Sequence, residues 1–360
     1  MTRPGSIHLG TLLAAFFSLL GCELPAEAPV PDMTLPLEER LDALLPGLLA
    51  EHGVPGAAVV MIEGGETLVR GYGLRRAGRP EPIGPDTVFE AASLGKPLFA
   101  YAMMQRVEAG ALDLDRPLAE DLERLPTEDE ARFRRITARQ VLAHTTGLPN
   151  WRPNRFSDDP GPLRVLRKPG EAFGYSGEGY MALQQVSERQ AGESMERSIQ
   201  TSLFEPLGMS RSRYSWTRSF ETDFALPHDR EGKTGEKRYL RRAGAAYSLH
   251  STAADLARFL QRMLDRTDAI AEAMLAPQVE ISGRLAWSLG WGLERRPECD
   301  WFWQWGDNSG FKHFALGSRR QGRAVLVLTN GDKGPHVYRT VVEAALGVRP
   351  EALSFKMIRY

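Results

Sequence analysis

Apolar residues recur at two different spacings near the start of the chain. From Leu37 to Glu51 they recur at helical spacing, which predicts a first helix. Two short apolar runs follow, Ala57–Ile62 and Thr67–Tyr72, and the segment Glu63–Glu66 with its two glycines separates them. Because a glycine pair between two short apolar runs favours a tight turn, these residues predict a β-hairpin.

The pattern becomes mainly helical from Ser93 to about Gln200, where loops rich in proline, glycine and aspartate join the segments. Helical spacing covers Leu98–Ala109, Ala138–Leu142 and Gly179–Gln190. The middle of the chain therefore predicts a mainly helical region.

Strand patterns return beyond Ser251, which is a candidate N-cap for a helix over Ala253–Leu264. The predicted strands are Leu285–Leu293, Asp300–Trp305, Lys312–Gly317 and Ala324–Thr329, and a final helix is predicted over Val337–Leu346. We therefore predict an α/β (α+β) domain of residues 37–350. Residues 37–95 and 250–350 would build its body, and residues 96–249 would form a helical region inserted between them.

Residues 1–21 have the pattern of an export signal. Arg3 and His8 precede an apolar run, Leu9–Leu20, that is too short to span a bilayer as a permanent helix. The residues at its end, Leu19-Leu20-Gly21-Cys22, resemble the bacterial lipobox. That resemblance implies that Cys22 carries a lipid and becomes the mature N-terminus.

A lipid on Cys22 would hold the protein at the bacterial cell envelope, with its body in the periplasm or outside the cell. Residues 22–36 are rich in proline and predict an extended tether between the lipid and the body. An ordinary secretory signal cleaved after Ala28 is the alternative, and Pro29 directly after that site argues against it.

Composition and charge narrow the classes of function. The 360 residues are 42% apolar, and 45 basic residues nearly balance 46 acidic ones, so no net electrostatic field favours nucleic acid as a partner.

The seven histidines are scattered without the spacing of paired metal ligands, and we predict neither a metal nor another cofactor. Cys299 is the second of two cysteines and cannot form an intramolecular disulfide if Cys22 carries lipid. The pattern gives no indication of the oligomeric state.

Ser93-Leu94-Gly95-Lys96 directly precedes a helical pattern, which places Ser93 at the start of a helix. Residues three apart lie on one helix face, so Lys96 would lie beside Ser93, near the positive end of the helix dipole. A serine hydroxyl needs a base, and a lysine can be that base if burial or a neighbouring cation lowers its pKa. The S-x-x-K pattern by itself also fits an N-cap serine followed by a solvated lysine.

Four further motifs accompany Ser93–Lys96. In chain order they are Val141–Leu148 (VLAHTTGL), Pro169–Gly177 (PGEAFGYSG), Phe204–Met209 (FEPLGM) and Ser251–Leu256 (STAADL). With them the chain, from about His52 to Leu346, resembles the serine beta-lactamase and penicillin-binding protein family. The resemblance is to its branch of class C beta-lactamases, D-alanyl-D-alanine carboxypeptidases and esterases. It implies an antiparallel sheet flanked by helices, and an acyl-enzyme formed on Ser93 with Lys96 as the base.

The resemblance assigns Tyr175 to the tyrosine that carries a proton from the serine to the leaving group. A phenol close to ammonium groups loses its proton more readily. A buried tyrosine with only a packing role is the alternative. Gly177 stands where the family usually has asparagine, so an amide that would bind the substrate carbonyl and steady the lysine is missing.

The family's third element, K-T-G or H-x-G on an edge strand, corresponds to Gln304-Trp305-Gly306, where the cation is also missing. The resemblance implies that these three residues contact substrate and that the N–H groups of Ser93 and Asp307 form the oxyanion hole. Glutamine cannot pair with a carboxylate as lysine does. We therefore expect an ester or small amide as substrate, ahead of a D-amino-acid peptide and a beta-lactam. The losses at Gly177 and Gln304 also motivate an alternative, a non-catalytic binding or sensing protein that retains the fold.

Two histidines could be mistaken for the base of a serine hydrolase. The resemblance implies a structural role for His144, in a turn after a helix, and His313 is a candidate to line the cleft. No G-x-S-x-G motif occurs, which argues against the α/β-hydrolase fold. Five tryptophans near the predicted strands are expected to fill the core, with one or two lining an apolar acyl pocket: Trp287, Trp291, Trp301, Trp303 and Trp305.

Overall fold

The computed structural model describes residues 36–122, 127, 129–155, 157, 161–297 and 300–358. These residues belong to one compact unit of residues 31–360. The predicted signal peptide, nearly all of the predicted tether, and both Cys22 and Cys299 lie outside the described residues.

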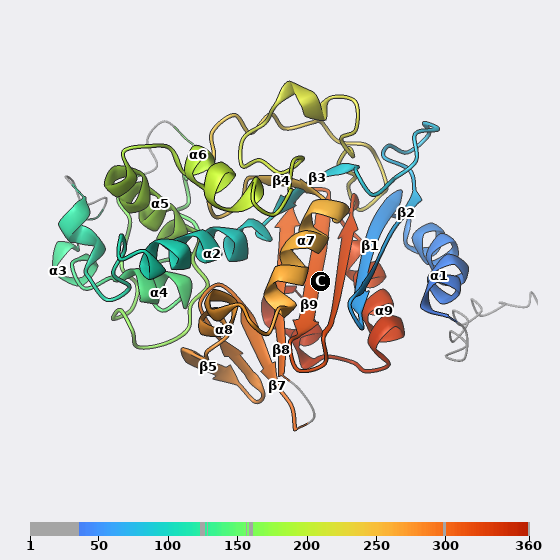
Figure 1. Ribbon diagram of the computed structural model, residues 1–360. Helices are drawn as coiled ribbons and strands as arrows, with labels where there is room; N and C mark the ends of the chain where they lie inside the picture. The colour runs from blue at the N-terminus through green and yellow to red at the C-terminus, as the bar shows by residue number, and fades with distance from the viewer. Residues whose placement is uncertain are drawn as a thin grey trace, which may run out of the picture. The chain divides into compact units, whose positions relative to one another are not determined.

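The described strands form one large and one small antiparallel sheet. The strands are β1 (Gly56–Glu63), β2 (Glu66–Gly73), β3 (Val88–Ala92), β4 (Leu249–Thr252), β5 (Val279–Ser282), β6 (Leu285–Trp287), β7 (Gly292–Arg295), β8 (Asp300–Asn308), β9 (Phe311–Ser318) and β10 (Arg323–Thr329). The large sheet has the order β2-β1-β10-β9-β8-β7-β6-β5, and β3 pairs with β4 (Figure 1). Strands from the two ends of the chain therefore share one sheet, and the predicted fold class is confirmed.

Helices cover both faces of the large sheet and form a region beside it. The α-helices are α1 (Leu37–His52), α2 (Gly95–Glu108), α3 (Glu130–Phe133), α4 (Ala138–Leu142), α5 (Gly177–Ala191), α6 (Met195–Ile199), α7 (Ala253–Leu264), α8 (Ala269–Met274) and α9 (Gly334–Leu346). Helix α7 packs on β1 and β10, and α9 packs on β9, β10 and α1. Helices α2 to α6 lie to one side of the sheet in Figure 1.

Burial on both faces explains the continuous apolar run of β1. Ala58 and Val60 lie in the core that contains α7, whereas Val59 and Met61 lie in the core that contains α1 and α9. Successive side chains of a strand point to opposite faces, so both sets of positions must be apolar.

Two details of the predicted elements are wrong. The predicted strand Leu285–Leu293 is broken into β6 and β7 by a turn in which Gly290 has a φ of 97°, a conformation that glycine adopts without strain. The cap of α7 is Thr252, whose hydroxyl accepts the Asp255 N–H at 3.1 Å. Ser251 instead pairs with β3 as part of β4.

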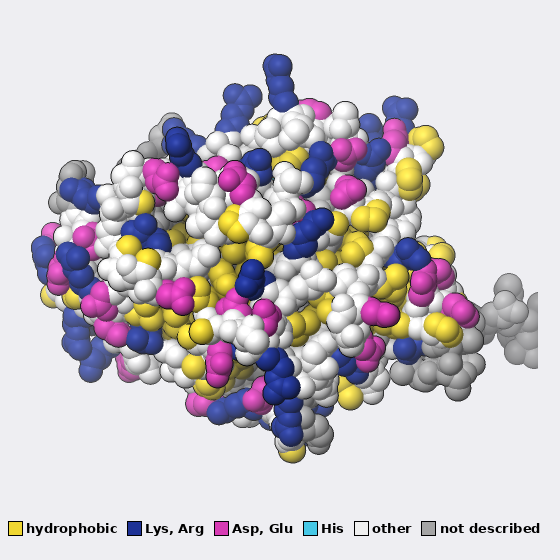
Figure 2. Space-filling model, viewed as in Figure 1, with side chains coloured by type: hydrophobic (Ala, Val, Ile, Leu, Met, Phe, Trp, Pro, Cys, Tyr) yellow, Lys and Arg dark blue, Asp and Glu magenta, His cyan; other side chains and the backbone are white. Residues whose placement is uncertain are grey.

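The face shown in Figure 2 carries basic and acidic side chains interspersed, as the balanced composition predicts. Within the described ranges, no helix has both the length and the apolar character that a membrane span needs.

Candidate active site

Ser93 lies in the turn that joins β3 to α2. The residue before it, Ala92, has a positive φ of 54°, which is uncommon for a residue with a Cβ. Lys96 lies in the first turn of α2, and its Nζ donates a hydrogen bond to Ser93 Oγ at 2.9 Å. The two side chains thus lie together, as their three-residue spacing predicts.

Lys96 is fully buried. Its Nζ also donates to the carbonyl oxygen of Ala246 at 2.6 Å and lies 4.8 Å from the centre of the Tyr175 ring. Burial lowers the pKa of Lys96 from 10.5 to about 7, because the protein interior solvates an ammonium group poorly. Near neutral pH a large fraction of Lys96 is therefore a free amine, which can accept a proton from Ser93.

The Tyr175 ring is packed between other rings, 4.1 Å from that of His144 and 4.6 Å from that of Trp305. Its hydroxyl is buried and makes no hydrogen bond of standard geometry with any described residue. Burial raises the pKa of Tyr175, and the nearby Ser93 and Gln304 side chains lower it only in part. The expectation of an easily lost phenolic proton is therefore wrong, because desolvation outweighs the neighbours; Tyr175 stays protonated at neutral pH.

Strand β8 approaches the end of β3 closely enough to require a glycine. A Cβ on Gly306 would lie 2.6 Å from the carbonyl oxygen of Ala91, which is shorter than any normal contact. Because Gly306 has no side chain, β8 can lie against β3. Asp307 is the next residue on β8 after this point of close approach. The segment of Ser93 and the strand of the expected oxyanion hole therefore pack together.

Asp307 is held by a buried cation on the neighbouring strand. Lys312 on β9 donates to Asp307 at 2.8 Å and forms a second ion pair with Asp332, also at 2.8 Å. This network ties the β8–β9 hairpin to the loop before α9, so it fixes the backbone around Asp307.

Comparison with known proteins places this chain in a family. A family model described as Beta-lactamase matches residues 41–347. The chain belongs to the beta-lactamase family. Its predicted membership is thereby confirmed, and a serine hydrolase is supported over a non-catalytic binding protein.

Two relatives and one solved structure extend the match. Penicillin-binding protein 4 of Amycolatopsis lactamdurans is 30% identical over 283 residues, which cover 71% of this chain and 73% of that protein. Penicillin-binding protein 4* of Bacillus subtilis (strain 168) is 26% identical, and the match covers 72% of this chain but only 64% of that protein. The octameric penicillin-binding protein homologue from Pyrococcus abyssi has the same fold, with a TM-score of 0.75 and 24% identity over 87% of this chain and 78% of that chain.

The His144 ring packs against that of Tyr175 in the candidate site. Its Nδ1 accepts the N–H of Ser176 at 3.0 Å, and its backbone has a positive φ of 55°. Burial, helped by the positive charge of Lys96, keeps the pKa of His144 well below its usual value. The ring is therefore neutral and orients the segment of Tyr175, in line with its expected structural role.

His313 does not line the cleft. It is fully buried on β9, where its Nδ1 accepts the N–H of Thr329 at 3.2 Å, so the proton lies on Nε2. That Nε2 donates to the carbonyl oxygen of Glu90 at 2.9 Å, three residues before Ser93. His313 thus joins the strand of Ser93 to the central sheet, and burial lowers its pKa to about 4, which keeps it neutral.

Replacing His313 with leucine is expected to lower kcat by about 10- to 100-fold with little change in KM, because the serine segment loses one hydrogen-bonded link to the sheet. His228 is a matched control, since it is equally buried and joins Asn330 and Ala77 at 2.7 and 3.1 Å. His228→Leu should cost similar stability and leave kcat unchanged. Equal losses of kcat in both variants would contradict a positioning role for His313.

The two other expected substrate contacts on β8 are buried. The Oε1 of Gln304 accepts the N–H of Trp305 at 3.0 Å, and its Nε2 has no partner among the described residues. Trp305 packs against Tyr175 and Phe355 in the core. Both side chains are therefore buried and do not form a wall open to solvent, and the Trp305 ring packs directly against that of Tyr175. The other four tryptophans are also buried in the two cores, as expected.

Sequence reasoning missed several residues of the site. Ala246 offers only its backbone carbonyl to Lys96, which no sequence pattern reveals. Glu90 is buried and accepts hydrogen bonds from Arg238 and Asn308, and its burial raises its pKa while these two neighbours lower it in part. A lone glutamate inside the apolar run before Ser93 was a signal that could have indicated this cluster.

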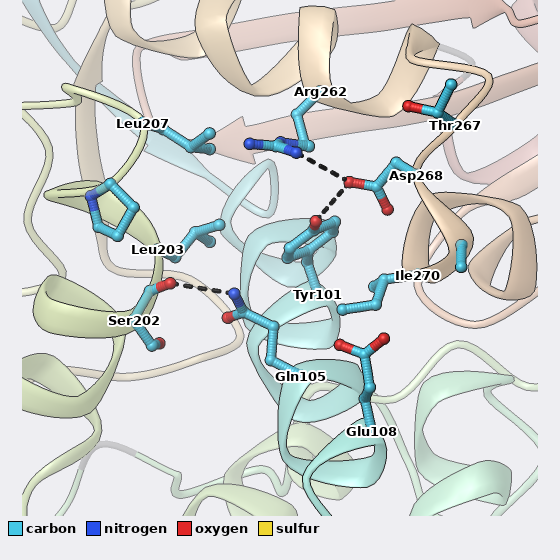
Figure 3. Close-up of a pocket in the computed structure, with 12 residues that line it drawn as sticks. Tyr101, Gln105, Glu108, Ser202, Leu203, Leu207, Arg262, Thr267, Asp268 and Ile270 are labelled. Carbon is cyan, nitrogen blue, oxygen red and sulfur yellow. Dashed lines mark hydrogen bonds and ion pairs between the residues drawn. The ribbon is translucent and has the colours of Figure 1, made fainter.

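A cavity of about 370 Å³ beside α2 includes none of these site residues (Figure 3). Its polar groups largely bind one another: the Tyr101 hydroxyl donates to Asp268 at 2.7 Å, and Gln105 donates to the Ser202 carbonyl at 3.0 Å. These bonds anchor α2, the helix of Lys96, to its neighbours. In the described part of the chain, no group of three or more His, Cys, Asp or Glu side chains is placed to hold a metal ion.

Proposed function

We propose that the protein hydrolyses a carboxylic ester or small amide through an acyl-enzyme on Ser93, with Lys96 as the base and Tyr175 as the proton carrier. The observation that carries this proposal is the 2.9 Å hydrogen bond between Ser93 and a fully buried lysine whose pKa is about 7. Burying a lysine costs stability, but it also lowers the pKa of the lysine, so such burial is expected where a lysine must act as a base.

In the proposed reaction the free amine of Lys96 takes the Ser93 proton as Oγ adds to the substrate carbonyl carbon. The N–H groups of Ser93 and Asp307 stabilise the oxyanion. Tyr175 then gives its proton to the leaving group and receives the one held by Lys96, which suits a phenol whose pKa burial has raised. Water next attacks the acyl-enzyme carbonyl while Lys96 takes a proton from it. The carboxylic acid then leaves as its bond to Ser93 Oγ breaks, and Lys96 returns the proton to that oxygen.

Substrates without a carboxylate fit the site best. Gln304 replaces the lysine that would pair with a carboxylate, and its side chain is fully buried. A D-amino-acid peptide is the second candidate, ahead of a beta-lactam. The Amycolatopsis lactamdurans relative is named a penicillin-binding protein, which supports testing both.

The dependence of kcat/KM on pH tests the role of Lys96. For p-nitrophenyl acetate, kcat/KM should rise as Lys96 loses its proton and should level off above an apparent pKa of about 7. A profile that stays flat from pH 6 to 9 would contradict Lys96 as the base.

We also propose that a lipid on Cys22 anchors the protein in the bacterial cell envelope, with residues 22–36 as the tether. The lipobox-like Leu19–Cys22 and the named penicillin-binding relatives support this proposal. Radiolabelled palmitate should label the wild type and not Cys22→Ser; equal labelling of both would overturn it.

A further inference from the structure

The cavity of about 370 Å³ beside α2 contains a buried carboxylate, Asp268, whose hydrogen bonds are already made (Figure 3). Its Oδ2 accepts the Tyr101 hydroxyl at 2.7 Å and an Arg262 N–H at 3.4 Å. Its Oδ1 accepts the Ala271 N–H at 2.7 Å. Asp268 therefore holds Arg262 at one end of the cavity and has no acceptor site left for a ligand.

Three other groups that line the cavity keep hydrogen-bonding capacity. Arg262 binds Asp268 through Nη1, so the N–H groups on Nε and Nη2 remain for a ligand. The Gln105 amide donates from Nε2 to the Ser202 carbonyl at 3.0 Å, which fixes its orientation, and its Oε1 is buried without a partner among the described residues. The exposed carboxylate of Glu108 makes no hydrogen bond or ion pair with any residue that the structure describes. The cavity thus offers a cation, an amide acceptor and an anion.

These three groups follow one another along α2. Tyr101, Gln105 and Glu108 are four and three residues apart, so they lie on one face of the helix. Arg262 lies at the Tyr101 end, because both side chains bind Asp268. Figure 3 shows the Gln105 amide between the Arg262 and Glu108 side chains. Because an α-helix rises about 1.5 Å per residue, the cation and the anion lie roughly 10 Å apart.

A free dipeptide has its charges and its peptide N–H at this spacing. Hydrogen bonds of about 2.8 Å at each end leave roughly 5 Å between the two charges of a ligand. The two charges of a single α-amino acid share one Cα and lie too close together. In a dipeptide the ammonium and the carboxylate lie on Cα atoms about 3.8 Å apart, and the peptide N–H lies between them. An extended dipeptide therefore reaches both ends of the cavity and places its N–H near the middle.

Apolar side chains form walls beside the polar groups. Leu203 and Leu207 line one side of the cavity, and Ile270 lines the other (Figure 3). A cavity of about 370 Å³ is within the usual size range of sites for small molecules. An apolar side chain on the dipeptide would pack against these walls.

We propose that this cavity binds a free dipeptide with an apolar side chain. Its carboxylate binds Arg262, its peptide N–H binds Gln105 Oε1, and its ammonium binds Glu108. Binding gives the buried amide oxygen the donor that it lacks and pairs both charges of the ligand. The cavity shares no lining residue with the Ser93 site, so this inference does not rest on the proposed function.

Isothermal titration calorimetry with glycylleucine tests the proposal on the Ser93→Ala variant, which cannot form an acyl-enzyme. Three related compounds each remove one feature: N-acetylglycylleucine lacks the ammonium, glycylleucinamide lacks the carboxylate, and leucine lacks the peptide unit. Glycylleucine should bind, and each related compound should bind at least about 10-fold more weakly. No binding of glycylleucine, or equal dissociation constants for the four compounds, would overturn the proposal.

Two variants show which end of the cavity binds which charge. Arg262→Met should make glycylleucine bind no better than glycylleucinamide and should keep the preference over N-acetylglycylleucine. Glu108→Gln should have the reverse effect, and because Glu108 is exposed this change should leave the fold intact. Arg258→Met is the matched control, since Arg258 lies on the same helix, is 46% exposed against 40% for Arg262, and pairs with Asp255 at 3.0 Å. It should leave all the dissociation constants unchanged.

Binding of glycylleucine that neither Arg262→Met nor Glu108→Gln weakens would place the ligand elsewhere, the Ser93 site included, and would overturn the proposal. Labelling of Ser93 by a fluorophosphonate in the wild type is a separate measurement. Failure of that labelling would count against the proposed function and leave the dipeptide site standing, and failure of glycylleucine binding would do the opposite.

Discussion

Replacing Lys96 with methionine is expected to lower kcat/KM for an ester by about 1000-fold and, at pH 7, to stabilise the folded protein. The loss of activity follows from removal of the base that lies 2.9 Å from Ser93. The gain in stability follows because burial of Lys96 opposes its charged form, and methionine of similar length has no charge to lose.

The pKa of Lys96 also sets the direction in which the free energy of unfolding changes with pH. The pKa of Lys96 is about 7 in the folded protein and 10.5 ordinarily, so between these values the unfolded chain binds more protons. The free energy of unfolding of the wild type should therefore rise with pH over this window, by a total on the order of 4 kcal/mol. Lys96→Met should lack this rise.

Lys312→Met is the matched control for stability. Lys312 is also a buried lysine, but it pairs with Asp307 and Asp332. Its removal leaves two carboxylates without their cation and should destabilise the protein by about 3 kcal/mol. Chemical denaturation at pH 7 and 9.5 measures both variants. Destabilisation of Lys96→Met at pH 7 would show that the lysine is held as a charged structural partner.

Tyr175→Phe is expected to lower kcat by about 100-fold with no loss of stability. The Tyr175 hydroxyl is buried and makes no hydrogen bond of standard geometry with any residue that the structure describes, so its removal should cost little unfolding free energy.

Tyr101→Phe should behave in the opposite way. Its hydroxyl donates to Asp268 at 2.7 Å, so the change should cost about 1–2 kcal/mol of unfolding free energy and leave kcat unchanged. Assays of kcat and of thermal unfolding on both variants test this difference. Tyr175→Phe should lose kcat and keep its stability, and Tyr101→Phe should lose stability and keep its kcat. If Tyr175→Phe retained full kcat, Tyr175 would have only a packing role.

The local parts of the site could be predicted from the sequence. Ser93 and Lys96 are three residues apart at the start of a helix, and that spacing alone brings their side chains together. The apolar runs of β1 and β10 likewise predicted strands, because each run is continuous and bounded by turn residues. Family motifs added Tyr175, which lies far along the chain.

The remaining features depend on contacts between distant segments. Ala246 acts through its backbone, and the cavity between Arg262 and Glu108 appears only when α2 and α7 are brought together. His313 was expected at the cleft because its strand neighbours the site. Its fully buried ring instead donates to the backbone carbonyl of Glu90 on β3.

Formation of an acyl-enzyme on Ser93 is the central claim, and intact-protein mass spectrometry tests it most directly. Residues from about 30 onward would be exposed to p-nitrophenyl esters, nitrocefin and a fluorophosphonate, with Ser93→Ala treated in parallel. We predict one adduct per chain on the wild type, mapped by peptide sequencing to Ser93, and none on Ser93→Ala. A folded wild type that forms no adduct, or forms the same adduct when Ser93 is replaced, would contradict the account.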